Sequence, residues 1–176
     1  SAEAFLSKNA NAITDALATA DNISTFKFIV KNVASRKGLH ATFMPKPVFG
    51  INGSGMHTHQ SLHASAKNLF HEASTPSHLS TTCLHYIGGL LKHGAAVLAF
   101  TNPSTNSYRR LIPGFEAPIN AFFSLGNRSA AGRIPKYATQ PETARFEFRP
   151  PDATCSIYLA LAAQFANRTG GMTADL

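Results

Sequence analysis

The sequence predicts an α+β fold, and three observations carry this prediction. Apolar residues recur at helical spacing in the segments 15–37, 77–101 and 157–167. Two short segments, 56–63 and 145–149, are predicted as strands. The helices and strands do not follow one another in a regular βαβ order, which favours α+β over a doubly wound parallel sheet.

The N-terminal part is predicted to hold one helix followed by two strands. The helix at 15–37 ends just before a glycine, Gly38, as helices commonly do. Residues 40–44 are rich in apolar side chains and are followed by a proline, which indicates a short strand. A glycine-rich turn at 50–55 leads into the second strand, at 56–63.

The rest of the chain is predicted to alternate between regular and irregular segments. Residues 64–76 are expected to form a surface loop, and 77–101 a single long helix. The segment 102–137 is rich in Pro, Gly, Asn and Arg and is predicted to be irregular. A strand at 145–149 and a last helix at 157–167 complete the expected order.

Length and composition exclude several classes of protein. The chain has 176 residues, about the size of one domain, so one compact unit is expected. Hydrophobic residues make up 44% and charged residues 14%, which excludes a disordered or fibrous chain. The apolar stretches at 95–100 and 157–163 are far shorter than the roughly 20 residues of a membrane-spanning helix. A membrane protein is therefore not expected.

The cysteine content and the N-terminal residues indicate a cytoplasmic protein. Cys83 and Cys155 are too few and too far apart for a disulfide framework, so both are expected to be buried and reduced. No basic segment followed by an apolar core marks a secretory signal near residue 1.

The positive charge is concentrated in one part of the sequence. The net charge is +7, and six of the eight arginines lie between Arg109 and Arg149. Basic charge spread evenly would suggest a nucleic-acid partner. A dense arginine cluster with few acidic neighbours instead indicates a pocket for carboxylates or phosphates, which arginine binds in bidentate fashion.

A histidine pair follows the glycine-rich turn at 50–55. If 56–61 is extended, His57, His59 and Ser61 point to one face, with neighbouring members about 7 Å apart. The two imidazoles then bind one metal ion, serve neighbouring sites, or are simply half-buried strand residues. The glycine run is not a phosphate-binding loop of the Walker type, because no Lys-Ser or Lys-Thr follows it.

The strand at 145–149 alternates phenylalanines with charged residues. Its two phenylalanines are expected to face the core, while Arg145, Glu147 and Arg149 share the opposite face. A carboxylate between two guanidinium groups stays ionised. Such a glutamate is suited to a divalent cation, and the arginines to an anionic substrate. The alternative is a surface ladder of ion pairs.

A loop-rich segment at 102–135 contains four arginines and a single glutamate, Glu116. Prolines on both sides stiffen the backbone around Glu116. A segment of this kind is costly to order unless it binds something, although an ordinary basic surface loop would have the same composition.

Five blocks of the sequence, taken in their order along the chain, resemble motifs of the bacterial type of the glutamine synthetase family. The resemblance spans about residues 20–163. It rests on the segments 46–61, 106–118, 127–130, 133–135 and 145–159. The resemblance implies part of that family's catalytic domain, an antiparallel sheet with flanking helices. It also implies a ligase that makes glutamine from glutamate, ammonium and ATP through a γ-glutamyl phosphate, with Mg²⁺ or Mn²⁺ as cofactor.

The resemblance also implies a role for each matching residue. His57 and Glu147 would hold the metal ion. Glu116 would close over the site and accept a proton from ammonium, and Arg128 would act in catalysis on the transferring phosphoryl group. The residues expected to bind glutamate are Asn52, Gly53, Arg110, Glu116 and Arg149. The residues expected to bind ATP are His59, Ser61, Arg128, Arg133 and Arg145.

The resemblance covers only part of such an enzyme. Residues 1–176 are expected to be a single partial catalytic domain, without the N-terminal β-grasp domain that completes a neighbouring subunit's site in the family. A metal-binding glutamate of the family falls near Lys8, a cation, and a lysine of the family falls at Glu142. Full-length relatives are expected to form dodecamers.

Three other functions stay open at this point. The first is a non-catalytic remnant that binds nucleotide or glutamate, or that pairs with a full-length subunit. The second is a γ-glutamyl ligase that uses a larger amine. Nucleic-acid binding is the third, and a membrane partner is not expected.

Overall fold

The computed structural model describes residues 15–166, and Lys8 lies outside them. The chain divides into two compact units, residues 1–43 and 44–176. In the first, helix α2 (Ala16–Arg36) begins at Asp15, whose side chain accepts a hydrogen bond from the backbone of Ala18 at 2.9 Å. This confirms the helix predicted at 15–37. The strand predicted at 40–44 is wrong, because these residues pair with no β-strand of the described chain.

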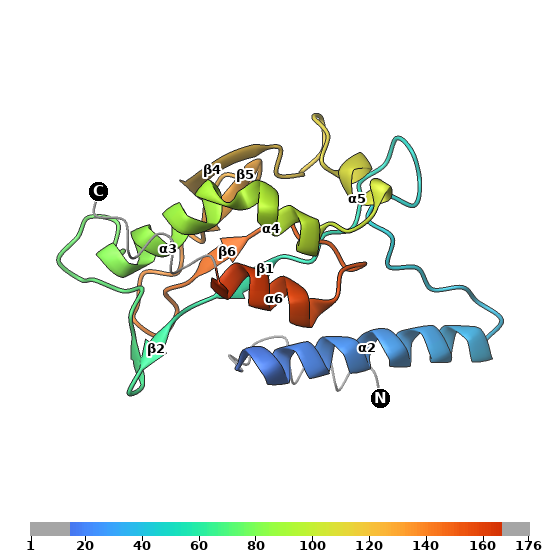
Figure 1. The fold of residues 1–176 in the computed structure, drawn as a ribbon, viewed down its shortest axis with the longest axis horizontal. Coiled ribbons are helices and arrows are strands. Elements are labelled where there is room, and N and C mark those ends of the chain that lie inside the picture. The colour runs from blue at the N-terminus through green and yellow to red at the C-terminus, as the bar shows by residue number, and fades with distance from the viewer. Residues whose placement is uncertain (1–14, 167–176) are drawn as a thin grey trace. The chain divides into compact units, whose positions relative to one another are not determined.

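The second unit is built around a mixed four-stranded sheet (Figure 1). Its strands lie in the order β1-β6-β5-β4. Their bounds are β1 (Thr58–Gln60), β6 (Phe146–Phe148), β5 (Ala130–Ile134) and β4 (Asn120–Leu125). The pairs β1–β6 and β6–β5 are antiparallel, and β5–β4 is parallel. The predicted α+β class with flanking helices is confirmed, and one strand pair runs parallel within a sheet predicted as antiparallel.

The central strand β6 separates the core from the opposite face of the sheet. Phe146 and Phe148 are fully buried in the hydrophobic cluster, together with Tyr86, Ile87 and Leu90. Glu147 alternates with the phenylalanines and therefore points to the other face. The prediction for 145–149 is confirmed in this respect. The strand predicted at 56–63 is shorter than expected, since only three of its residues pair with β6.

Three helices cover one face of this sheet. They are α3 (Thr81–Lys92), α4 (Gly94–Thr101) and α6 (Ile157–Ala166), and Figure 1 shows them in front of the strands. The last helix agrees with the prediction at 157–167 over its described residues. The single helix predicted at 77–101 is wrong. It is two helices bent by 74° at a break, where His93 ends α3 and begins α4.

Two segments predicted as irregular contain regular structure. The predicted loop at 64–76 contributes to a small hairpin, β2 (His63–Ala64) paired with β3 (Lys67–Asn68). It also buries Phe70 completely. The segment at 102–137 contains α5 (Thr105–Arg110), β4 and β5. Strand β5 pairs with β6, which comes later in the sequence, and β4 pairs with β5, so neither strand is set by its local sequence pattern alone.

No single helix of the described range is long and apolar enough to cross a membrane. The bent pair α3–α4 reaches that length and composition when its two members are taken together. Cys83, Tyr86 and Leu90 of α3 are buried in the hydrophobic core of the unit. Cys83 and Cys155 are both buried free thiols, as predicted.

Candidate active site

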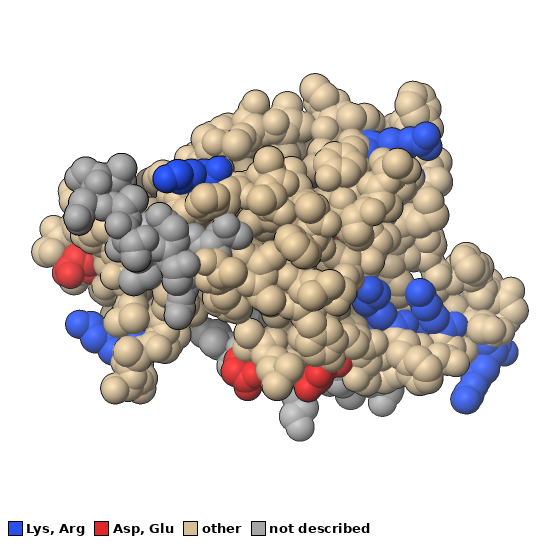
Figure 2. All heavy atoms as spheres, viewed as in Figure 1, with Lys and Arg blue, Asp and Glu red and all other residues tan. Residues whose placement is uncertain are grey.

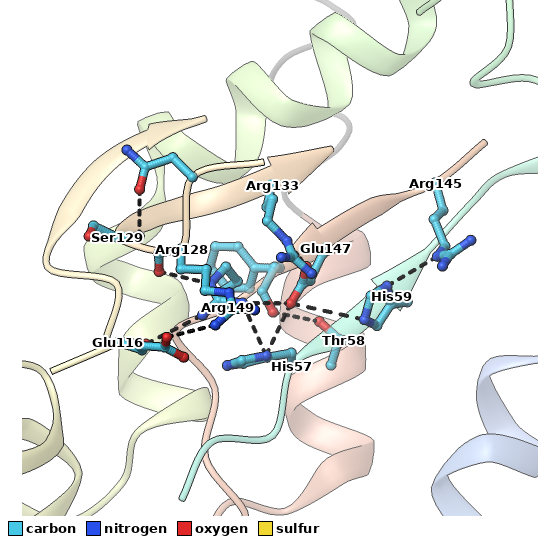
Figure 3. Close-up of polar contacts among 12 residues, drawn as sticks. His57, Thr58, His59, Glu116, Arg128, Ser129, Arg133, Arg145, Glu147 and Arg149 are labelled. Carbon is cyan, nitrogen blue, oxygen red and sulfur yellow. Dashed lines mark hydrogen bonds and ion pairs between the residues drawn. The ribbon is translucent and has the colours of Figure 1, made fainter. Parts of the chain in front are cut away.

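The face of the sheet opposite the core carries a group of charged side chains centred on Glu147 (Figure 3). Its carboxylate is 1% exposed. One oxygen, Oε1, accepts from Nη1 of Arg149 at 2.7 Å and lies 3.0 Å from Nδ1 of His57. The other oxygen accepts from Nε of Arg133. Both oxygens are therefore held by donors from three different segments.

These contacts keep Glu147 ionised. Burial alone would raise the pKa of its carboxyl group. The hydrogen bonds from His57 and Arg133, with the charges of His59 and Arg149, outweigh burial and lower the pKa to about 2. Glu147 is thus a permanent anion at neutral pH, as the sequence predicts.

His59 lies beside this group, on the same face of the sheet. Burial, together with the charge of Arg145, lowers the pKa of its imidazole, although Glu147 acts in the opposite direction. Nδ1 of His59 accepts from Nε of Arg145 at 3.2 Å, so a neutral ring carries its hydrogen on Nε2. Nε2 lies 4.0 Å from Glu147. The predicted common face of His57 and His59 is therefore observed.

Arg145 forms the outer edge of the group. Its Nη2 donates to the hydroxyl of Tyr137 at 2.8 Å, and its guanidinium lies 5.0 Å from the centre of that ring. Ser61 lies past the end of β1, and its hydroxyl is 3.1 Å from Nε2 of His63. Ser61 thus contacts the β2–β3 hairpin, whereas the other residues predicted to bind ATP lie around Glu147 or the pocket.

A pocket opens beside the Glu147 group. Its volume is about 170 Å³. Its lining includes all five residues that the sequence predicts for glutamate: Asn52, Gly53, Arg110, Glu116 and Arg149. His57, Gly55, Phe115 and Ala117 complete the wall. Sites for drug-sized ligands measure about 300–1,000 Å³, so this pocket suits a smaller molecule.

The two arginines of the pocket are anchored by backbone carbonyls. Arg110 donates from Nη1 to Pro150 and Pro151 and from Nη2 to Arg149, and burial lowers the pKa of its guanidinium to about 10. Arg149 donates to the carbonyl oxygens of Arg128 and Glu116 as well as to the Glu147 carboxylate. Each guanidinium has five N–H donors, and the three bonds named here do not use all of them on either arginine.

Glu116 and Arg128 form an ion pair at the mouth of the pocket. Nη1 of Arg128 lies 2.6 Å from Oε1 of Glu116, and both side chains are more than half exposed. Exposed pairs of this kind contribute little to stability, so each partner is available to exchange its contact for a ligand. The pocket therefore offers cationic donors for carboxylates and a carboxylate for an amine.

The described residues do not form a complete site for a magnesium ion. His57 and Glu147, the predicted ligands, are adjacent, but no group of three or more His, Cys, Asp or Glu side chains within 15–166 is placed to hold one ion. Magnesium requires about six ligands, mostly oxygens, in octahedral geometry. Both oxygens of Glu147 already accept from arginines.

Sequence reasoning missed three members of this region. Tyr137, which binds Arg145, lies in a segment predicted only as irregular. Lys46 and Phe115, whose ammonium group and ring are in contact, lie within the segments that carry the resemblance, but the resemblance implies no role for them. A lysine before a proline resembles any surface lysine, and only the fold shows that it is buried.

Comparisons with known proteins show the family of this chain. The family model described as glutamine synthetase, catalytic domain, matches residues 10–176. The chain belongs to the glutamine synthetase catalytic-domain family.

On the face shown in Figure 2, the lysines and arginines of the larger unit are few and separated. Most of the arginines from Arg110 to Arg149 are instead gathered in the site described above.

Individual relatives show how much of the family's length the chain spans. A glutamine synthetase of Streptomyces coelicolor is 56% identical over 147 residues, which is 84% of this chain and 31% of the relative. One of Thermus thermophilus is 53% identical over 162 residues, 92% of this chain and 36% of the relative. A cryo-EM structure of Plasmodium falciparum glutamine synthetase matches with a TM-score of 0.87 at 38% identity, covering 93% of this chain and 32% of that one. The chain thus spans about a third of its relatives.

Proposed function

We propose that this chain carries the glutamate pocket and part of the phosphoryl-transfer site of a glutamine synthetase. The reaction is the ATP-dependent ligation of ammonium to glutamate. The observation that carries the proposal is the small pocket lined by Asn52, Gly53, Arg110, Glu116 and Arg149. Two anchored arginines are suited to the carboxylates of glutamate, and the pocket volume suits an amino acid.

The first step of the proposed reaction is phosphoryl transfer. A side-chain carboxylate oxygen of glutamate attacks the γ-phosphorus of ATP, which forms γ-glutamyl phosphate and releases ADP. Catalysis of such steps depends mainly on positioning and on charges placed where negative charge develops. Arg128, Arg133 and Arg145 would supply that charge, and His59 and Ser61 would contact the nucleotide.

The second step is attack by ammonia on the acyl phosphate. Glu116 would accept a proton from ammonium, after which ammonia displaces phosphate and leaves glutamine. In the structure Glu116 is paired with Arg128. An exposed pair opens at little cost, so arrival of the phosphoryl group would draw Arg128 away and leave Glu116 ready to bind ammonium.

A divalent cation belongs to the proposal only through the resemblance to the family. Mg²⁺ or Mn²⁺ would find His57 and Glu147 here, which is less than a complete ligand set. We therefore derive no step through the ion.

Further protein is also expected around this unit, because Phe122, Phe123 and Leu125 on the edge strand β4 are exposed.

The test places this chain in a full-length context. The matching third of the Streptomyces coelicolor enzyme is replaced by the present sequence, and phosphate release is measured with ATP, magnesium, glutamate and ammonium. We expect release that requires both glutamate and ammonium and that falls about a hundredfold or more in Arg128→Ala.

The control for this assay is Arg109→Ala, an exposed arginine of α5 outside the pocket. Its phosphate release should match that of the unmutated chimera. A folded chimera that binds ATP but releases no phosphate would contradict the ligase and favour a binding remnant. Release that requires an amine larger than ammonium would favour the other γ-glutamyl ligase.

A further inference from the structure

Lys46 is a charged side chain buried behind the wall of the pocket. It is only 7% exposed. Its ammonium group lies 3.5 Å from the centre of the Phe115 ring and donates a hydrogen bond to the carbonyl oxygen of Ile51. Burial of a charge is costly unless partners compensate for lost hydration. A cation over an aromatic face is such a partner, and it is strongest where water is excluded.

The backbone of Lys46 is fixed independently of its side chain. Its N–H donates to Oδ1 of Asn106 at 2.8 Å, and its carbonyl oxygen accepts from Nδ2 of the same side chain at 2.9 Å. Asn106 belongs to α5, which is anchored by a capping box at Ser104. Lys46 therefore projects from a fixed point.

The segment 45–54 closes on itself around Lys46. The N–H of Ser54 donates to the carbonyl oxygen of Pro45 at 2.7 Å. A Cβ atom on Gly53 would lie 2.3 Å from that same oxygen, so only glycine permits this approach. The tip of the segment is open, since Phe49 is 95% exposed. Its base is tight, and the Lys46 side chain crosses the base to reach Ile51.

The ammonium group of Lys46 contacts two residues, and each is directly followed in the sequence by a residue that lines the pocket. Asn52 follows Ile51, and Glu116 follows Phe115. Both line the pocket, from segments more than sixty positions apart in sequence. The ammonium group is thus placed to set the spacing between the two walls.

We propose that Lys46 is a positioning residue that holds Asn52 and Glu116 at the separation needed for glutamate. It acts through Ile51 and Phe115 and does not itself touch the substrate. The role deepens the proposed function and rests on it. The ammonium group is the essential part, because it provides both the hydrogen bond and the contact with the ring.

The test compares variants that separate charge from bulk. Lys46→Met keeps an unbranched stem and removes the ammonium, and Lys46→Arg keeps a cation. Phe115→Leu removes the ring, and Lys46→Met with Phe115→Leu removes both partners. Lys92→Met, at an exposed lysine of α3, is the matched control. Glutamate affinity is measured by calorimetry on the full chain, and the urea midpoint of unfolding is measured without ligand.

We expect Lys46→Met and Phe115→Leu each to weaken glutamate binding about tenfold. The double variant should bind glutamate no more weakly than either single variant, because both changes break the same contact between Lys46 and Phe115. Lys46→Arg should stay within about threefold of the wild type, and Lys92→Met should not differ from it. The shifts of the urea midpoint should likewise be less than additive.

Unchanged affinity in Phe115→Leu, or additive losses in the double variant, would overturn the role of Lys46. Phe115→Leu keeps the proposal testable even where Lys46→Met does not fold. The urea experiment separates two kinds of failure. A wild-type chain that binds no glutamate contradicts the proposed function. Additive shifts of the urea midpoint in the double variant contradict the link between Lys46 and Phe115, whether or not glutamate binds.

Discussion

At the scale of single residues, Glu147 links the stability of the site to pH. Its folded pKa of about 2 lies below the unfolded value near 4.5, because His57 and Arg133 donate to it. A carboxyl group with a lowered folded pKa stabilises the protein above its unfolded pKa and loses that contribution as the pH falls through the folded value. The relevant window therefore runs from about pH 5 down to about pH 2.

We predict that the difference in unfolding free energy between wild type and Glu147→Gln shrinks by roughly 3 kcal/mol from pH 5 to pH 2. Urea unfolding at several pH values measures it. Glu142→Gln, which removes an exposed carboxylate outside the Glu147 group, serves as the control. A Glu147→Gln difference that does not change with pH would show that the carboxylate is not held by these donors.

Two glycines give a second prediction at this scale. A Cβ on Gly53 would overlap the carbonyl oxygen of Pro45, whereas one on Gly88 in α3 meets nothing within 4 Å. Gly53→Ala should therefore displace the pocket wall and weaken glutamate binding about tenfold or more. Gly88→Ala should stabilise the protein by about 0.5–1 kcal/mol, because alanine favours a helix interior. Calorimetry measures the glutamate affinity of both variants, and urea unfolding measures their stability. Equal glutamate affinity and equal stability in the two variants would contradict the close approach of Gly53 to the Pro45 carbonyl oxygen.

The sequence predicts the chemistry of these residues better than their surroundings. The alternation at 145–149 is enough to place Glu147 between arginines on one face. The sequence does not show that Arg110 donates three hydrogen bonds to backbone carbonyl oxygens. Those contacts depend on how the segment 149–151 meets α5, which is a property of the folded chain.

At the scale of elements, Gln164 joins helix α6 to strand β1. It is fully buried, and its Oε1 accepts from Thr58 at 2.7 Å and from Gln60 at 2.6 Å. Its Nε2 donates to the carbonyl oxygen of Ala160 at 2.9 Å. Strand β1 carries the residues that follow His57, so this network sets the position of the strand against the core.

We predict that Gln164→Leu lowers the free energy of unfolding by about 2–3 kcal/mol, since it removes the acceptor shared by two buried donors. Urea unfolding measures the change. Leu159→Gln, at an exposed position of the same helix, should stay within about 0.5 kcal/mol of the wild type. A small effect of Gln164→Leu would mean that β1 is positioned by its pairing with β6 alone.

Elements with a strong local pattern are the ones that the sequence predicts. Helices α2 and α6 and strand β6 agree with their expected positions. The break between α3 and α4 was missed, because His93 carries no helix-ending signal beyond the glycine after it. Strand β5 was missed because Gly132 is a poor strand residue, and it is required where the Phe146 ring packs.

At the scale of the whole molecule, the described chain brings together one site from five separate segments of sequence. The pocket and the Glu147 group share His57 and Arg149, so the predicted substrate site and the predicted phosphoryl-transfer site are continuous. The resemblance predicts this grouping, and the arginine clustering predicts its charge. Within residues 15–166 the ligand set for a cation is incomplete, and the chain spans about a third of the length of its relatives.

The central claim is that this pocket binds glutamate, and calorimetric titration of L-glutamate into the chain tests it most directly. Asn52→Ala removes a pocket side chain without a described structural contact, and Asn32→Ala in α2 is its control. The account predicts saturable binding that weakens about tenfold in Asn52→Ala and is unchanged in Asn32→Ala. Absence of binding, or equal affinity in all three proteins, would contradict it.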